Sequence, residues 1–157
     1  MLQATWQRLA FLGRQNIYVS TQKRYAKLVK KQLPRLPPSH LILEEAARDT
    51  GPSICYSAHI LETHGHRDDI MAIVYADHLI GHPDRWQAAL QETASYADAQ
   101  NKFGVVAVKA QNPDTNLGYI KIGQILQKGI YEVTDFVEKP NLARATQFVH
   151  SYRYFWN

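Results

Sequence analysis

Apolar residues recur with two different spacings along the chain, and together these spacings predict an α/β protein. Helical spacing predicts helices over residues 2–12, 21–33, 52–64, 83–97 and 142–152. Short apolar runs predict strands over residues 16–19, 41–43, 70–75, 103–108, 118–122 and 130–137. Helices and strands alternate as far as residue 108, which is typical of a mostly parallel sheet flanked by helices. We expect one domain over residues 1–157.

The stretch from Ile70 to Tyr75 is an unbroken apolar run, and it predicts a strand buried on both faces. Asp77 follows this run almost directly. In open α/β sheets the ligand crevice lies beyond the carboxyl ends of the strands, so Asp77 is a candidate metal or substrate ligand. A turn or helix-capping role for Asp77 is equally compatible with its position.

Composition narrows the class of protein. The 157 residues are enough to bury a substantial core, and the net charge of +4 comes from scattered basic residues. Nucleic-acid binding is therefore not favoured. A single cysteine, Cys55, excludes an intrachain disulfide and fits a reducing compartment. No apolar stretch reaches membrane-spanning length, so we expect a cytoplasmic protein that does not engage a membrane.

Two segments carry candidate anion-binding chemistry. The loop from Glu44 to Pro52 links a predicted strand to a predicted helix, where free amides and the Arg48 guanidinium suit a phosphate. The alternative is that Asp49 or Thr50 caps the helix while Arg48 is solvated.

The segment F-V-E-K-P, from Phe136 to Pro140, places an acid and a base side by side at the end of a strand. Glu138 suits a sugar hydroxyl and Lys139 suits a phosphate, although both could simply face solvent. In N-L-G-Y-I, from Asn116 to Ile120, the glycine permits either close approach to a ligand or a turn.

The residues of these segments and their order along the chain resemble those of a known family, the mannose-1-phosphate guanylyltransferases, within the sugar-1-phosphate nucleotidyltransferases. The matching segments are L-Q-A-T-W-Q-R-L, N-I-Y-V-S-T, L-E-E-A-A-R-D-T-G-P-S, A-D-H-L-I, N-L-G-Y-I, F-V-E-K-P and Y-F-W-N. They extend over nearly the whole chain. The resemblance implies a Rossmann-like nucleotidyltransferase core.

The resemblance also implies a reaction and a set of residues. An oxygen of mannose-1-phosphate would attack the α-phosphorus of GTP, giving GDP-mannose and pyrophosphate with the help of Mg²⁺. Asp77 would be the metal ligand and Lys139 the contact to the sugar phosphate, both counted as catalytic. Substrate-binding residues would be Arg48, Asp49 and Thr50 on the nucleotide side, and Gly118, Tyr119, Glu138 and Asn157 on the sugar side.

Some features of the family are missing from this sequence. The family opens with a strand and a G-G-x-G-x-R-L-x-P loop that cradles the triphosphate, and it continues to a second metal-ligand aspartate. We therefore expect a core that is incomplete at both ends, and no full turnover by this chain alone. The alternatives are a non-catalytic module that binds a sugar phosphate or nucleotide sugar, or only a partner protein, and a related enzyme for another base or sugar. The oligomeric state is open and includes a homo-oligomer.

Overall fold

The structure is a computed structural model that describes residues 1–157. The chain forms two compact units, Met1–Pro83 and Asp84–Asn157, and each is described by itself. Both units contain helices and strands, which confirms the predicted α/β class. The single domain over residues 1–157 stays a prediction. No helix in the chain is both long enough and apolar enough to cross a membrane.

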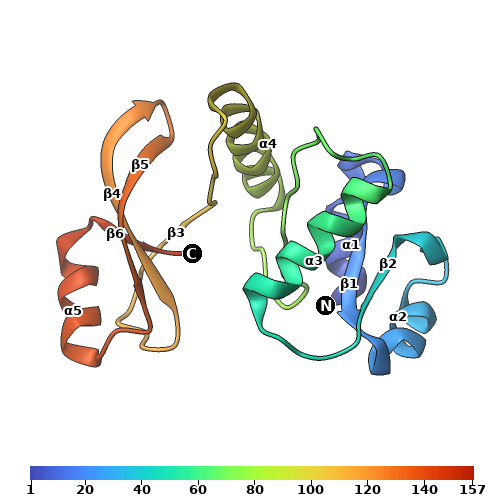
Figure 1. Cartoon of the computed structure of the whole chain (residues 1–157). Helices are drawn as coiled ribbons and strands as arrows, with labels where there is room; N and C mark the ends of the chain where they lie inside the picture. Colours follow the sequence, from blue (N-terminus) through green and yellow to red (C-terminus); the bar gives the residue numbers. More distant parts are fainter. The chain divides into compact units, whose positions relative to one another are not determined.

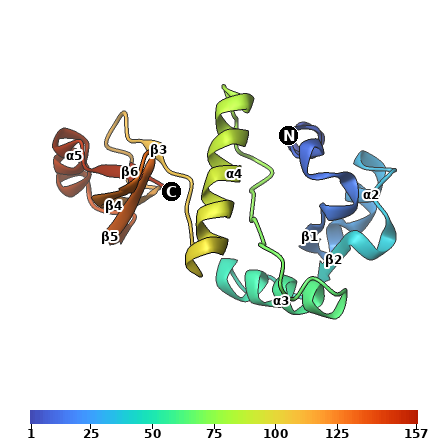
Figure 2. The same cartoon turned by 90° about the horizontal axis from the view of Figure 1, so that it is seen from above.

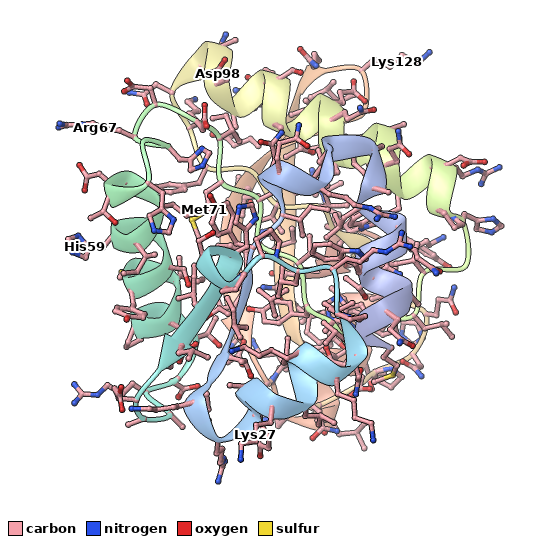
Figure 3. All side chains as sticks on the ribbon, turned by 90° about the vertical axis from the view of Figure 1, so that its right-hand side faces the viewer. Lys27, His59, Arg67, Met71, Asp98 and Lys128 are labelled. Carbon is pink, nitrogen blue, oxygen red and sulfur yellow. The ribbon has the colours of Figure 1, made fainter.

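The N-terminal unit is built around two short parallel strands. Its elements are α1 (Leu2–Arg8), β1 (Val19–Gln22), α2 (Ala26–Gln32), β2 (Leu41–Glu44) and α3 (Thr50–Thr63). Single 3-10 turns lie between them at Ala10–Leu12, Arg14–Asn16, Lys23–Tyr25 and Pro38–His40. Val19 lies opposite Leu41, and Gln22 lies opposite Glu44. Helices α1 and α2 lie on one side of the strands and α3 on the other (Figures 2 and 3).

One apolar cluster holds α1 and α2 against the strands. Its buried members are Trp6, Ile17, Val29 and Leu33. Val29 lies in α2, and Leu33 follows the end of this helix; the Leu33 amide donates a hydrogen bond to the Val29 carbonyl at 2.8 Å. The α-helix ends at Gln32 because Pro34 restricts Leu33 to a non-helical conformation. The helix predicted over 21–33 also begins later than expected, since residues 21–22 belong to β1 and residues 23–25 form a 3-10 turn.

The predicted strand from Ile70 to Tyr75 is wrong. The segment forms no strand and pairs with no strand, and Ile73 is 46% exposed. A strand is defined by its ladder, and β1 pairs only with β2. Without a neighbouring strand, apolar β-branched residues do not make a strand by themselves. Met71, labelled in Figure 3, lies among other side chains, whereas His59 and Arg67 project outward.

The C-terminal unit contains an antiparallel sheet. Its elements are α4 (Pro83–Gln100), β3 (Val108–Lys109), β4 (Gly118–Gln127), β5 (Ile130–Glu138), α5 (Leu142–Ser151) and β6 (Tyr154–Trp156). The strand order is β3-β6-β4-β5, and every pairing in this sheet is antiparallel. Helix α5 lies along the sheet (Figure 1). Parallel pairing is thus confined to β1 and β2.

Helix α5 is well specified by its sequence. The Asn141 side chain accepts a hydrogen bond from the Arg144 amide at 3.0 Å, which caps the first turn. Ala145 and Phe148 face the sheet and are buried against Tyr119. Tyr152 ends the helix in a left-handed conformation (φ 56°). Phe148 stacks on Tyr154 with 3.8 Å between ring centroids, so α5 and the end of the chain form one core.

Several predicted boundaries are wrong by a few residues. The strand expected at 16–19 begins at Val19, since residues 14–16 form a 3-10 turn. The helix expected over 2–12 ends at Arg8. The strand expected at 103–108 is reduced to Val108–Lys109, because only these two residues have a partner, in β6. Strand β4 continues five residues beyond its predicted end at residue 122, to Gln127. The remaining helices and strands, apart from α2, lie within about three residues of their predicted positions.

Candidate functional site

Three chain segments meet at one place: the start of β4, the end of β5 and the C-terminal residue of the chain. Gly118 lies directly opposite Glu138 in the sheet. The Asn157 amide donates a hydrogen bond to the Gly118 carbonyl at 3.3 Å, and the Lys139 amide donates to the Leu117 carbonyl at 3.3 Å. The structure therefore brings together Gly118, Glu138, Lys139 and Asn157, although they are separated by up to 39 positions in the sequence.

The absence of a side chain at Gly118 leaves a niche bordered by oxygen atoms. A Cβ atom built on Gly118 would lie against Asn157 Oδ1 and 2.9 Å from Glu138 Oε2. Phe136 Cζ would be 3.1 Å away on the same side. We call the space above Gly118, bordered by Phe136, Glu138 and Asn157, the glycine niche. Two acceptor oxygens beside an aromatic ring suit the hydroxyl groups and the apolar face of a sugar.

Lys139 supplies a positive charge beside the glycine niche. Its Nζ atom is 3.3 Å from Glu138 Oε1, and the side chains of Lys139 and Glu138 are 62% and 56% exposed. An ion pair this exposed is weak, so Lys139 can release Glu138 and turn toward an anionic ligand. The backbone of Lys139 is left-handed (φ 45°), a conformation that costs a non-glycine residue about 1–2 kcal/mol.

The side chain of Tyr119 points away from the glycine niche. It is 0% exposed and packs against Phe148 and Trp156. Its hydroxyl donates a hydrogen bond to the Asp114 carbonyl at 2.8 Å. Successive side chains in a strand point to opposite faces, and Gly118 takes the other face. Tyr119 therefore belongs to the core, and only its backbone borders the niche.

One pKa in the same sheet is shifted. Burial raises the pKa of Tyr154 above its usual value, and the negative charge of Asp135 raises it further. Tyr154 packs on Phe148 of α5 and belongs to the Tyr119 cluster, so it lies on the face opposite the glycine niche. Its ionisation bears on stability and not on the niche.

The predicted nucleotide-side residues lie in the other unit, at the start of α3. Arg48, Asp49 and Thr50 are all exposed. Asp49 occupies the N-cap position with φ 69°, but no side chain accepts a capping hydrogen bond there. The expected cap is therefore present only in part: Asp49 occupies the N-cap position, but its side chain makes no capping hydrogen bond. The first amides of α3 stay available to an anion.

Glu44 is a polar residue that the sequence analysis did not single out. It is half-buried at the end of β2, and its Oε1 atom accepts hydrogen bonds from the hydroxyls of Ser20 at 2.8 Å and Ser53 at 2.7 Å. These bonds join β1, β2 and α3 just before the loop that carries Arg48. Sequence spacing could not reveal this, since Ser20 is 24 positions away.

A second polar cluster surrounds Tyr18. The ring of His40 stacks on Tyr18, the Tyr18 hydroxyl is 2.9 Å from His66 Nε2, and His66 Nδ1 is 2.7 Å from Asp69 Oδ2. These contacts tie the loop after α3 to the start of β1. No group of three or more histidine, cysteine or acidic side chains in the chain is arranged to hold a metal ion.

Asp77 is exposed in a turn beside α1. The preceding residue, Ala76, accepts a hydrogen bond through its carbonyl from the Thr5 hydroxyl at 3.3 Å. An open cavity of about 360 Å³ adjoins the turn, lined by Met1, Ala4, Thr5, Arg8, His78, Leu79, Ile80 and Pro83. One accessible carboxylate fits a Mg²⁺ ion whose other ligands are water and substrate phosphates, which is how this ion is commonly bound. It does not fit a metal site made by the protein alone.

Comparisons with known proteins identify the family to which this chain belongs. A sequence model of the family described as Nucleotidyl transferase matches residues 1–157. A mannose-1-phosphate guanylyltransferase of Escherichia coli strain K12 is 34% identical over 164 residues, covering 100% of this chain and 34% of the relative. The alginate biosynthesis protein AlgA of Pseudomonas fluorescens is 35% identical over 161 residues, covering 100% of this chain and 33% of the relative.

A solved structure resembles this chain over nearly its whole length. The crystal structure of a mannose-1-phosphate geranyltransferase from Thermus thermophilus superposes with a TM-score of 0.82 at 25% identity, over 99% of this chain and 44% of that one. The chain thus spans about a third of the length of the curated relatives it matches. With the family model matched over all 157 residues, the chain belongs to the nucleotidyl transferase family.

Proposed function

We propose that this chain carries substrate-binding parts of a mannose-1-phosphate guanylyltransferase, which transfers GMP from GTP to mannose-1-phosphate and releases GDP-mannose and pyrophosphate. The family acts on nucleoside triphosphates and sugar 1-phosphates. The names of the relatives support mannose-1-phosphate and guanine in particular. The single cysteine fits a reducing compartment, and we assign the reaction to the cytoplasm.

The observation that carries the proposal is the glycine niche with Lys139 beside it. In our proposal Glu138 Oε2 and Asn157 Oδ1 accept hydrogen bonds from sugar hydroxyls, because both oxygens border the space above Gly118. The Lys139 ammonium leaves Glu138 and pairs with the sugar phosphate. A lysine suits this role as a compact, mobile point charge.

The chemistry asked of the residues is alignment and charge neutralisation. A phosphate oxygen of mannose-1-phosphate attacks the α-phosphorus of GTP, a new P–O bond forms, and the bond to pyrophosphate breaks on the opposite side. Lys139 holds the attacking phosphate, and the free amides of α3 with Arg48 hold phosphate on the nucleotide side. Enzymes of this family generally use a divalent metal. We propose Mg²⁺ with Asp77 as its protein ligand, where it would neutralise phosphate charge.

A second candidate is a sugar-phosphate binding module without catalysis. It is favoured by one observation: the glycine niche and Lys139 are formed entirely within Asp84–Asn157. Sugar-phosphate binding would then need none of the nucleotide-side residues. The two candidates differ in whether GTP binds as well.

Calorimetric titration of the purified chain tests the proposal. The ligands are mannose-1-phosphate, GTP and GDP-mannose, each with Mg²⁺. The key variant is Lys139→Ala, and the matched control is Lys128→Ala, which removes an equally charged lysine from the turn between β4 and β5. We expect Lys139→Ala to weaken mannose-1-phosphate binding at least tenfold, or about 1.4 kcal/mol. Lys128→Ala should leave the affinity within twofold.

The outcomes separate the candidates. Binding of both mannose-1-phosphate and GTP, with the sugar phosphate sensitive only to Lys139, supports the transferase. Binding of mannose-1-phosphate without GTP supports the non-catalytic module. Equal effects of Lys139→Ala and Lys128→Ala, or no binding by a folded sample, would contradict the assignment of the glycine niche.

A further inference from the structure

The segment from Ile70 to His78 lies outside every helix and strand, and residues 76–77 form a turn. A hydrogen bond ties this turn to α1: the Thr5 hydroxyl donates to the Ala76 carbonyl at 3.3 Å. Thr5 and Ala76 are 71 positions apart, so this contact is purely tertiary.

The Thr5 hydroxyl is held in a donating orientation. Its oxygen accepts a hydrogen bond from Arg8 Nη2 at 3.0 Å, one turn further along α1. A hydroxyl has one proton, and with Arg8 on the acceptor side that proton is left for Ala76. Thr5 is only 6% exposed, so water does not compete strongly for the bond. Thr5 and Ser57 are the only two polar residues in the chain that are this deeply buried.

The acceptor is the residue directly before Asp77. A fixed Ala76 carbonyl fixes the plane of the Ala76–Asp77 peptide, because the peptide unit is planar. It thereby fixes the point from which the Asp77 side chain projects. We propose that Thr5, oriented by Arg8, is the positioning residue that holds the Ala76–Asp77 turn and so presents the Asp77 carboxylate to a divalent cation. This inference rests on the proposed metal role of Asp77.

The test uses the full chain and two substitutions at one position. Thr5→Val keeps the shape of the side chain and removes the hydroxyl, whereas Thr5→Ser keeps the hydroxyl. Backbone ¹⁵N order parameters of residues 75–78 report the anchoring directly. We expect values of about 0.85 in the wild type and in Thr5→Ser, and below about 0.6 in Thr5→Val. The rest of α1 should not change, which separates positioning from a general loss of structure.

A second measurement connects the turn to the cation. Mn²⁺ alone is titrated as a paramagnetic probe, and broadening of the amide signals of residues 76–78 gives an apparent affinity. We expect Asp77→Asn to abolish the local broadening. Thr5→Val should weaken the apparent affinity roughly threefold to tenfold, and Thr5→Ser should restore it, because a mobile ligand must be ordered when it binds.

Each result has a defined meaning. Unchanged order parameters in Thr5→Val would overturn the inference. So would Mn²⁺ broadening that depends on Asp77 and is indifferent to the Thr5 hydroxyl. If Asp77→Asn leaves the broadening intact, the metal role in the proposed function fails and presentation to a cation fails with it. The order parameters then still decide whether Thr5 holds the turn.

Discussion

A methyl group at Gly118 should block the glycine niche without disturbing the fold. Gly118→Ala adds one Cβ atom, which would contact Asn157 Oδ1 and lie 2.9 Å from Glu138 Oε2. To reach ordinary van der Waals distance, the Glu138 oxygen must move by about half an ångström, and the nearer Asn157 oxygen must move further. The backbone of Gly118 lies outside the positive-φ region, so alanine adds no backbone strain.

The expected changes in stability and in affinity follow from the side chains that the new methyl group displaces. Glu138 and Asn157 are exposed and can shift at little cost, and alanine reduces the entropy of the unfolded chain. We therefore expect the free energy of unfolding to change by less than about 1 kcal/mol. Binding should suffer more, because a displaced carboxylate loses a charged hydrogen bond that contributes about 1.5–3 kcal/mol. Affinity for mannose-1-phosphate should fall roughly 10- to 100-fold.

The assay pairs calorimetry with thermal unfolding, and a second glycine of β4 supplies the control. Gly123→Ala also places a Cβ atom close to side chains, 2.6 Å from Thr134 Cγ2 and 2.9 Å from Glu132 Oε2. These groups do not border the glycine niche, so its binding should match the wild type. Wild-type affinity in Gly118→Ala, or an equal loss in Gly123→Ala, would refute the reasoning.

Three further predictions concern stability. Tyr119→Phe should lower the free energy of unfolding by about 1 kcal/mol, because it removes the bond to Asp114, and should leave mannose-1-phosphate affinity within twofold; a large affinity loss in calorimetry would contradict its place in the core. Glu44→Ala should lower the free energy of unfolding, measured in urea, by about 1–3 kcal/mol, because two serine hydroxyls lose their acceptor. Glu44→Gln should lower it less, and equal losses in the two variants would contradict the two hydrogen bonds to Glu44. The raised pKa of Tyr154 means that the unfolded chain ionises first, so its contribution to stability is complete below about pH 10 and is lost as pH rises through the folded-state pKa. Thermal melts above pH 10 should show less alkaline destabilisation in Tyr154→Phe than in the wild type.

The sequence predicted what depends on local spacing. Helix α5 was placed correctly because Ala145, Phe148 and their neighbours repeat with helical spacing, and β5 because its residues are rich in β-branched and aromatic side chains. Only the first half of β4 was predicted, since Gly123 and Gln124 interrupt its apolar run, whereas the strand continues to Gln127. Family motifs pointed to Gly118, Glu138, Lys139 and Asn157, and the structure brings these four residues together.

What the sequence missed depends on partners far along the chain. The Ile70–Tyr75 run has the composition of a buried strand, but strands need a neighbouring ladder and this segment has none. The same limit applies to Glu44 and Thr5, whose hydrogen-bond partners are 24 and 71 positions away in Ser20 and Ala76.

The direction of the Tyr119 side chain shows most clearly what the sequence predicts and what only the tertiary structure decides. The motif N-L-G-Y-I marks the segment, but alternation along a strand puts Gly118 and Tyr119 on opposite faces. Only the packing of α5 decides which face is core and which is open to a ligand. By itself the sequence determined where this strand begins and which of its residues are neighbours. The tertiary structure decided which of them face a ligand, because burial and hydrogen bonding between distant segments are properties of the folded chain as a whole.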